Sequence, residues 1–539
     1  MAKSLYLINP RSESPSYFGA EVFGHWGFPR AQAIADLATP TVAALAPADW
    51  KVTICDEYVE EVDLDHAADY VGITGKITQG SRMIALADEY RRRGRTVIIG
   101  GPYASLSPEA LREHCDVLVV GEIEAIHGEL FADLDAGRFA AEYTGERPDL
   151  ELSPLPRWDL YPHGRALEGC VQTSRGCPFE CEFCDVIQYL GRHQRHKPVA
   201  RILAELDALY ALGYRAAFLA DDNFTAYRKR AKEVLAALVA WNRDRPDGPM
   251  ALTTQLSIDA ARDDELLELL AEAGMVSVFI GIETPNVESL RETHKRQNVG
   301  VDLLGQVQRF LDHGIAVTAG MIVGFDHDGL DIFERQYEFA MASAIPIFSL
   351  GALVAPAATP LHERMARAGR LTAGGSEVAA TPWDTNIVPV SMSRGQLLDG
   401  LRWLCNRLYQ PESFARRTLT MVERLGPARG PFARERGLAP RRGARAVEAE
   451  GLALLRRFVK SGDEERRLWG RLSDAIARRP ETGSAVLNTL LRYAQVRCLY
   501  EVGRFWEPHP AETSPFAAPP PAAAEGLVGI GSSGRAGAA

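Results

Sequence analysis

Three cysteines near the middle of the chain have the spacing of ligands for an iron–sulfur cluster. Cys177, Cys181 and Cys184 stand at positions i, i+4 and i+7, so their thiolates can converge only if the backbone wraps around them as a loop. Three thiolates bind three irons of a four-iron cluster and leave the fourth iron open. A ferredoxin loop would supply another cysteine within a few residues, but here the next one is Cys405. The spacing therefore predicts a [4Fe-4S] cluster whose open iron holds an exchangeable ligand.

A structural zinc site is the alternative for these cysteines. It would need a fourth Cys or His, and His193 and His196 are close enough in sequence to supply one. The neighbouring residues favour the cluster instead, because Gly-Cys-Pro at 176–178 leads into the loop and Phe183 precedes its third cysteine. With these neighbours the loop resembles that of the radical S-adenosylmethionine (SAM) superfamily. The resemblance implies that SAM chelates the open iron and that one-electron reduction cleaves it to a 5′-deoxyadenosyl radical.

Length and composition indicate a globular protein of several domains. The chain has 539 residues, 46% of them hydrophobic, and a formal net charge of −11, which argues against nucleic-acid binding by the whole molecule. Its eight cysteines are scattered and form no disulfide framework, and an oxygen-sensitive cluster needs a reducing compartment. We therefore expect a cytoplasmic protein. The residues before the first apolar run are too few for a signal peptide, and no apolar run approaches the roughly 18 residues of a membrane span.

Residues 1–145 alternate short apolar runs with helical patterns, which predicts a doubly wound parallel sheet. The apolar runs cover 5–8, 51–55, 70–74, 96–99 and 117–120, and helical patterns cover 34–45, 79–93 and 108–114. Ligands of such sheets bind outside the carboxyl ends of the strands, where glycines let a large ligand approach the backbone. The candidate contacts at these ends are Asn9, Thr74, Gly75, Gly100, Gly101, Pro102, Gly121, Glu122 and Glu124.

The strand ends of this domain argue against a nicotinamide or flavin site, because no G-x-G-x-x-G follows the first strand. The Gly-Gly-Pro at 100–102 and the Gly-Glu-x-Glu at 121–124 resemble the cobalamin-binding domain that precedes the barrel in many radical SAM enzymes. This resemblance implies cobalamin as a cofactor. The chain departs from the D-x-H-x-x-G pattern of other cobalamin domains, since Tyr58 follows Asp56 and Glu57 after the second strand, and no histidine is placed to ligate cobalt from below. A flavodoxin-like domain that binds nothing is the alternative.

A proline-rich linker at 146–169 leads into a second α/β unit at 170–365. Strands and helices alternate again, which predicts a partial or full parallel barrel with its chemistry at the carboxyl ends of the strands. Cys170 lies on an apolar strand just before the cluster loop and is expected to be a core residue.

Several residues at the predicted barrel strand ends are candidate SAM contacts. The segment Gly-Ile-Glu-Thr-Pro at 281–285, with Gly281 and Glu283, resembles the superfamily segment whose acidic side chain reaches the ribose hydroxyls of SAM. The strand with Gly320 and Gly324 resembles the one that flanks the adenine. Asp222 follows another strand, where a helix N-cap is the alternative role. No catalytic side chain is identified.

The segment 370–507 loses its strand patterns and becomes amphipathic, which predicts a separate helical domain. Residues 411–480 carry 17 Lys or Arg against 9 Asp or Glu. A solvated helical face explains this surplus, and a surface for an anionic substrate or for peripheral contact with a lipid membrane is the alternative. Cys405 and Cys498 are expected in the core, and the Pro-, Ala- and Gly-rich tail at 508–539 is expected to be disordered.

Together, these resemblances imply that two reactive centres face one substrate cavity. In the resembling enzymes the deoxyadenosyl radical removes a hydrogen, the substrate radical takes a methyl group from methylcobalamin, and a second SAM remethylates the cobalt. The helical domain resembles that of the hopanoid methylases. We therefore expect a methyltransferase that acts on an unactivated carbon of a hopanoid-like lipid or a secondary metabolite, a small-molecule substrate, with flavodoxin or ferredoxin as electron donor.

Two other functions remain open. A tetrapyrrole-type oxidative cyclase or rearrangement enzyme would keep both cofactors without methyl transfer. A cobalamin-responsive binding protein with a vestigial barrel would keep neither the cluster nor the SAM site, and the intact three-cysteine loop together with Glu283 argues against it.

Overall fold

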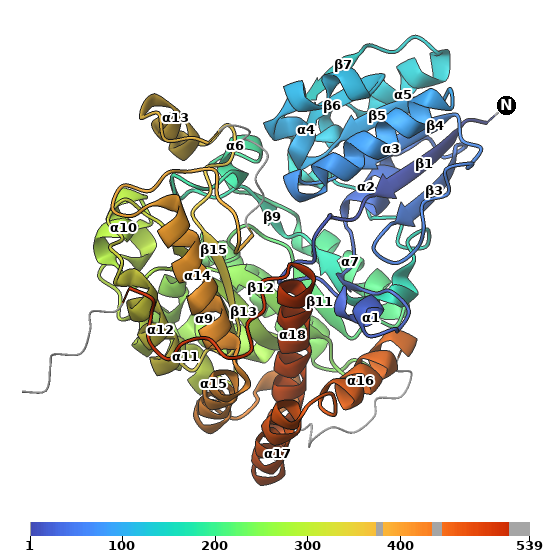
Figure 1. Ribbon diagram of the computed structural model, residues 1–539. Coiled ribbons are helices and arrows are strands. Elements are labelled where there is room, and N and C mark those ends of the chain that lie inside the picture. Colours follow the sequence, from blue (N-terminus) through green and yellow to red (C-terminus); the bar gives the residue numbers. More distant parts are fainter. Residues whose placement is uncertain (1, 373–380, 434–444, 517–539) are drawn as a thin grey trace, which may run out of the picture.

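Two parallel β-sheets form the frame of the protein (Figure 1). The computed structural model describes residues 2–372, 381–433 and 445–516. The first sheet has the strand order β3-β1-β4-β5-β6-β7 and the second the order β15-β14-β13-β12-β11-β8-β2. The first sheet consists of β1 (Ser4–Asn9), β3 (Lys51–Asp56), β4 (Tyr70–Thr74), β5 (Thr96–Gly100), β6 (Val117–Gly121) and β7 (Glu142–Gly145). The expected α/β class is confirmed.

The first sheet is doubly wound, since β3 and β4 pair with opposite sides of β1, and a crevice for a ligand is expected at such a switch point. Helices α2 (Ala38–Leu45), α3 (Gly80–Arg92), α4 (Pro102–Leu106) and α5 (His127–Ala136) connect its strands. The helix expected at 108–114 is instead two 3-10 turns, at Pro108–Ala110 and Arg112–His114. Strand β7 was not expected from the sequence, because Tyr143 is its only buried residue.

The second sheet is a partial barrel with two free edges, β15 and β2. Its strands are β2 (Gln32–Ile34), β8 (Ala166–Val171), β11 (Ala216–Leu219), β12 (Ala251–Leu256), β13 (Met275–Glu283), β14 (Ala316–Val323) and β15 (Phe348–Ala352). The helices between them are α7 (Val199–Ala211), α8 (Arg228–Asn242), α9 (Asp264–Ala273), α10 (Val287–Glu292), α11 (Leu303–Asp312) and α12 (Ile332–Ala342).

The segment between β1 and β3 leaves the first sheet and joins the second. It contains the short helix α1 (Val22–His25) and then β2, which pairs in parallel with β8. Before that, the Tyr17 hydroxyl donates to the carbonyl of Leu350 on β15 at 3.0 Å. This crossover therefore forms one edge of the partial barrel, β2, and contacts the other edge, β15. The expected helix at 34–45 begins only at Ala38, because Ile34 belongs to β2.

The linker between the two sheets is well packed. Trp158 and Tyr161 are each 2% exposed and belong to the main hydrophobic core. The Tyr161 hydroxyl donates to Asp56 at the end of β3 at 2.6 Å, and β8 begins inside the expected linker, at Ala166. The linker thus holds the two sheets together.

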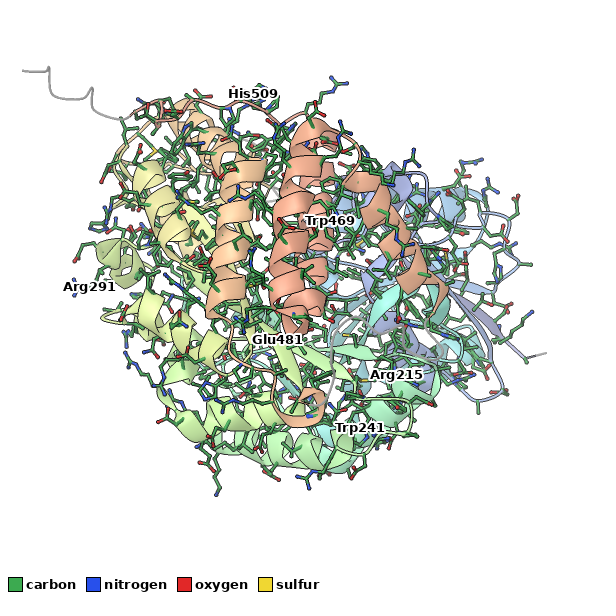
Figure 2. The ribbon with its side chains drawn as sticks, turned by 90° about the horizontal axis from the view of Figure 1, so that it is seen from below. Arg215, Trp241, Arg291, Trp469, Glu481 and His509 are labelled. Carbon is green, nitrogen blue, oxygen red and sulfur yellow. The ribbon has the colours of Figure 1, made fainter. Side chains whose placement is uncertain are left out.

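The C-terminal helices form a layer on the barrel. They are α14 (Arg394–Tyr409), α15 (Pro411–Arg424), α16 (Ala446–Phe458), α17 (Asp463–Arg478) and α18 (Gly483–Val502), whereas α13 (Pro360–Arg367) lies apart from them (Figure 1). Leucines of α14 at 397, 401, 404 and 408 join the same core as the barrel strands, so α14 has no core separate from the barrel. Figure 2 shows this layer from below, with Trp469 on α17 and Glu481 in the turn between α17 and α18.

The chain after α18 is partly packed, contrary to the disorder expected from residue 508. The indole of Trp403 donates to the carbonyl of Ala511 at 2.9 Å, and the ring of Phe516 contacts that of Phe333. The rest of the tail lies outside the described residues. Within the described ranges, no helix combines the length and the apolar character needed to cross a membrane.

Candidate functional site

The cluster loop leaves β9 (Ser174–Arg175), which pairs with β10 (Arg195–His196), and ends before the short helix α6 (Val186–Tyr189). Gly176 has φ +93°, and a Cβ there would lie 2.7 Å from the carbonyl oxygen of His193. Only glycine fits this turn. The Cys177 N–H donates to the Gly191 carbonyl, and the Cys184 N–H to that of Cys181. The backbone is thus wrapped as a loop, as the spacing of the three cysteines predicted.

The three loop cysteines form no disulfide and are shielded from solvent: Cys181 is buried, and Cys177 and Cys184 are partly buried. Burial raises the pKa of Cys177 to about 11 and that of Cys184 to about 12, so positive charge is needed to hold them as thiolates, and bound iron supplies it. No three His, Cys, Asp or Glu side chains in the described ranges are close enough to share one metal ion. A four-iron cluster does not need that arrangement, because each thiolate binds a different iron.

Two aspartates after β11 support this loop. Asp222 accepts the Gly176 N–H at 2.9 Å, and Asp221 accepts the hydroxyls of Thr173 and Ser174 at 2.8 and 2.7 Å. Burial raises the pKa of both aspartates to about 6. The residue before α8 is Tyr227, so Asp222 is not the cap of that helix and is placed instead against the cluster loop.

Glu283 ends β13 in a strained conformation. Its φ is +63°, and the pairing of β13 with β14 shifts register between Gly281 and Glu283. A non-glycine residue in this region costs on the order of 1–3 kcal/mol, and such strain concentrates at functional sites. Gly281 makes room for the bend, because a Cβ there would lie 2.2 Å from Oε1 of Glu283 and 2.9 Å from Nζ of Lys295.

Lys295 is a residue of this site that the sequence analysis missed. Its ammonium contacts Oε1 of Glu283 at 2.6 Å, and the side chains are only 13% and 9% exposed. The carboxylate and the nearby thiols of Cys181 and Cys184 raise the pKa of Lys295 despite its burial. A cation and an anion beside the cluster loop suit SAM, which carries both an amino and a carboxyl group.

Gln297 completes this side of the loop. Its amide Nε2 lies 3.6 Å from Sγ of Cys181, and its Oε1 is buried without a hydrogen-bond partner in the described part of the chain. An unpaired buried oxygen is costly, so a donor from a bound group would satisfy it. The residues present therefore fit a cluster with SAM bound beside it.

The two candidate glycines of β14 and its carboxyl end have different surroundings. A Cβ at Gly320 would lie 3.1 Å from Cζ of Phe279 and 3.9 Å from Oε2 of Glu283, which places Gly320 beside the expected SAM site. Gly324 has φ +103° and packs beneath Leu397 of α14. Its surroundings explain the glycine through local packing.

The candidate cobalamin contacts lie at the carboxyl edge of the first sheet. The Asn9 amide donates a hydrogen bond to Asp56 at 3.2 Å and accepts one from Gln79 at 2.9 Å. Gly101 has φ +95°, and a Cβ there would lie 2.5 Å from Oγ1 of Thr74. The other members of this edge are Gly75, Gly100, Pro102 and Gly121. Helix α4, which begins at Pro102, contacts α6 directly after the cluster loop, so this edge faces the cluster.

Glu122 and Glu124 form ion pairs between the first sheet and the strands β9 and β10, which make a small antiparallel pair of their own. Arg175, which directly precedes the cluster loop, contacts Glu122 at 2.6 Å and Glu124 at 2.7 Å. Arg195 contacts Glu122 as well, at 2.5 Å. All four side chains are at most 13% exposed. Both carboxylates, expected to contact a cofactor, are thus bound to arginines of β9 and β10.

Sequence comparisons give relatives for most of the chain. Residues 171–340 match the radical SAM superfamily, and residues 359–497 match a domain of unknown function, DUF4070. The hopanoid C-2 methylase of Rhodopseudomonas palustris is 31% identical over 426 residues, covering 78% of each chain. An uncharacterized methyltransferase of Synechocystis is 36% identical over 337 residues, 61% of this chain and 62% of that one. An anaerobic magnesium-protoporphyrin IX monomethyl ester cyclase of Rubrivivax gelatinosus is 26% identical, covering 53% of this chain and 56% of that one.

Among solved structures, the cobalamin-dependent SAM radical enzyme OxsB superposes with a TM-score of 0.59 at 16% identity, covering 93% of this chain and 80% of the other. At that identity the likeness concerns the fold. The match to the hopanoid C-2 methylase covers 78% of each chain at 31% identity. The chain therefore belongs to the radical SAM methylases that include the hopanoid C-2 methylase, and it has the fold of the cobalamin-dependent radical SAM enzymes.

Proposed function

We propose that this protein is a cobalamin-dependent radical SAM methyltransferase that methylates an unactivated carbon of a hydrophobic polycyclic or other natural-product scaffold. The observation that carries the proposal is the 31% identity to the hopanoid C-2 methylase over 78% of both chains. The three-cysteine loop and the Glu283–Lys295 pair support it, because their chemistry suits a cluster with SAM bound beside it. Helix α6, after the loop, also contacts α4 at the carboxyl edge of the first sheet.

Different residues would have separate roles in such a reaction. When bound, the cluster and SAM supply a carbon-centred radical, and cobalamin supplies the methyl group. Cys177, Cys181 and Cys184 hold the cluster, and Glu283 with Lys295 binds and orients SAM by charge-assisted hydrogen bonds. The glycine-rich edge at 100–102 leaves room for a large planar ring, and Gly101 adopts a conformation that favours glycine.

An aromatic side chain of the crossover supports an apolar substrate. Phe18 is 47% exposed, although its ring packs edge-to-face on Phe279 at a centroid distance of 5.3 Å. Phe279 in turn lies beside Gly320, next to Glu283. An exposed aromatic ring this close to the proposed SAM site offers an apolar contact for a substrate.

The experiment uses anaerobically reconstituted enzyme, a reductant, SAM with a deuterated methyl group, and a hopanoid. The expected result is a hopanoid with a deuterated methyl group on carbon, together with 5′-deoxyadenosine. If the hopanoid is not the substrate, the deuterated methyl group still appears on cobalamin. Absence of label from both the hopanoid and cobalamin contradicts methyl transfer.

A tetrapyrrole-type oxidative cyclase is the second candidate, favoured by the 26% identity to the Rubrivivax cyclase. It would convert magnesium-protoporphyrin IX monomethyl ester to a ring-closed product without incorporating the label. The same assay with that porphyrin therefore distinguishes the two functions by the mass of the product.

A one-electron donor such as flavodoxin or ferredoxin is part of the proposal, because SAM cleavage requires an electron.

The basic helical layer gives little support to a membrane surface. Several of its arginines are used internally as donors to backbone carbonyls, namely Arg417, Arg445, Arg457 and Arg479.

A further inference from the structure

Helix α13 is the first helix of the region that matches a domain of unknown function. Figure 1 shows it beside α6 and apart from the other C-terminal helices. Because α6 directly follows Cys184, α13 lies against the cluster loop although almost two hundred residues separate the two in sequence.

One residue of the cluster loop, Glu182, is held on every side. Its N–H donates to the carbonyl of Thr293, and its carbonyl accepts the N–H of Leu361 on α13, both at 3.1 Å. Its carboxylate accepts a two-pronged contact from Arg364 on α13, at 2.7 Å from Nε and 2.9 Å from Nη2. Such paired hydrogen bonds fix orientation as well as distance.

Arg364 also gathers two further carboxylates. Nη1 contacts Asp326 after β14 at 2.5 Å, and Nη2 contacts Glu292 at the end of α10 at 3.1 Å. Glu182 and Glu292 are only 10% and 9% exposed. Arg370 shares Asp326 at 2.6 Å. Without Arg364, Glu292 would keep its contact with His327 at 2.8 Å and Asp326 its contact with Arg370, whereas Glu182 would lose its two-pronged contact.

The next residue of the loop, Phe183, is held by apolar contacts. It packs against a small hydrophobic cluster that includes Leu361 and Met365 of α13 and Phe325. The rings of Phe183 and Phe325 lie 6.3 Å apart. Both residues between the ligands Cys181 and Cys184 are therefore fixed by the same helix, one by charge and one by packing.

We propose that α13 is a clamp that holds the cluster loop in its ligating conformation, and that Arg364 is the positioning residue of this clamp. The inference rests on the proposed cluster and gives a role to the first helix of the DUF4070 region. A loop already fixed by its neighbours loses less conformational freedom when the cluster binds. Loss of the clamp should thus affect the cluster more than the overall fold.

The test compares purified, anaerobically reconstituted wild-type protein with the variants Arg364→Gln, Arg364→Lys and Glu182→Gln. Arg291→Gln is the control, since Arg291 makes an exposed ion pair on the neighbouring α10. Three properties are measured: iron and sulfide per chain, the rate at which a ferrous chelator removes iron, and the electron paramagnetic resonance (EPR) spectrum of the reduced cluster.

Arg364→Gln should lose iron about tenfold faster than wild type or more, because it removes the arginine that binds the nearly buried carboxylate of Glu182 in the cluster loop. Its EPR signal should broaden, while circular dichroism of the cluster-free protein stays unchanged. Arg364→Lys keeps the positive charge but cannot make the paired hydrogen bonds to Glu182. Its rate of iron loss should therefore lie between those of wild type and Arg364→Gln. Combining Arg364→Gln with Glu182→Gln should cost less than the sum of the two changes, since both break one contact.

Wild-type retention of iron in Arg364→Gln would overturn the clamp, as would equal losses in Arg364→Gln and Arg291→Gln. If Arg364→Gln does not fold, the Arg364→Lys and Glu182→Gln variants decide the question by the same measurements. A wild-type protein that takes up no cluster would instead refute the proposed function, so the two failures are distinguishable.

Discussion

The three loop cysteines make the sharpest prediction at the scale of single residues. Replacing Cys177, Cys181 or Cys184 with Ala should abolish both the visible absorption of the cluster and 5′-deoxyadenosine formation, because each thiolate binds its own iron. Absorption spectroscopy and chromatography measure the two together. A variant that kept both would refute the assignment.

The other buried cysteines are the matched controls for this prediction. Cys170, Cys405 and Cys498 are at most 5% exposed and lie in the hydrophobic core. Replacing any of them with Ala should leave the iron content unchanged. Burial raises the pKa of Cys405 to about 12, so it stays a neutral thiol and packs as a small apolar residue.

Glu283 should serve SAM and not the cluster. Glu283→Ala should keep the iron content while weakening SAM binding by roughly 1.5 to 3 kcal/mol, the scale of a charge-assisted hydrogen bond. Equilibrium binding of SAM and iron analysis measure the two effects. Glu288→Ala is the control, because Glu288 lies in the first turn of the next helix, α10, with its side chain 57% exposed. Loss of iron at unchanged SAM affinity would contradict this role.

Arg417 carries a prediction at the scale of helices. It is fully buried without a carboxylate partner among the described residues, and it donates to the carbonyls of Leu408 on α14 and Pro346 before β15. Burial lowers its pKa to about 10. Arg417→Leu would leave these carbonyls unsatisfied and should destabilise the protein by roughly 2 to 4 kcal/mol.

Thermal unfolding of the cluster-free protein measures this loss. The adjacent Arg416 is exposed, so Arg416→Leu is a control with the same change of side chain. A similar melting temperature for both variants would show that Arg417 does not join α15 to the barrel.

The turns at the carboxyl edge of the first sheet make a prediction about cobalt. No histidine occurs at 9–12, 56–61, 74–79, 100–103 or 121–124, and the Tyr58 hydroxyl is hydrogen-bonded to Ser12 at 2.7 Å. We therefore expect base-off cobalamin without a nitrogen ligand from the protein. EPR of the cobalt(II) form tests this, because an axial nitrogen splits the high-field lines into triplets. Such triplets in the bound cofactor would reveal an unidentified ligand.

Sequence patterns revealed those elements whose signal is local. The strands β1, β3 and β4 are buried apolar runs, and the cluster loop is set by the spacing of three neighbouring residues. The strands β2 and β7 were not predicted, because they are short and have no continuous buried face. A helical pattern even extended into β2, where pairing with β8 determines the structure.

Site residues that depend on tertiary contacts were not visible in the sequence. Lys295 lies twelve positions beyond Glu283 in a region without a motif, and only folding brings it to that carboxylate. Glu122 and Glu124 were identified as strand-end acids, but their partner Arg175 is about fifty residues away. Motifs of neighbouring residues could therefore be predicted from the sequence, whereas ion pairs between residues far apart in the chain could not.

At the scale of the whole molecule, the arginines of β9 and β10 connect the two halves of the proposed active site. Arg175 and Arg195 hold Glu122, and Arg175 also holds Glu124. These contacts join the carboxyl end of β6 to the start of the cluster loop. They should fix the distance between cobalamin and the cluster, on which methyl transfer depends.

The double variant Glu122→Gln, Glu124→Gln tests this coupling from the side of the first sheet, where no cluster ligand is changed. It leaves two buried arginines without carboxylate partners, so the two sheets should separate more easily. The cluster content should stay that of wild type, whereas pulsed EPR between cobalt(II) and the reduced cluster should show a broader range of distances. Glu129→Gln, an exposed change on α5, is the control. An unchanged, narrow distance distribution in the double variant would mean that the linker packing of Trp158 and Tyr161 alone aligns the two cofactors.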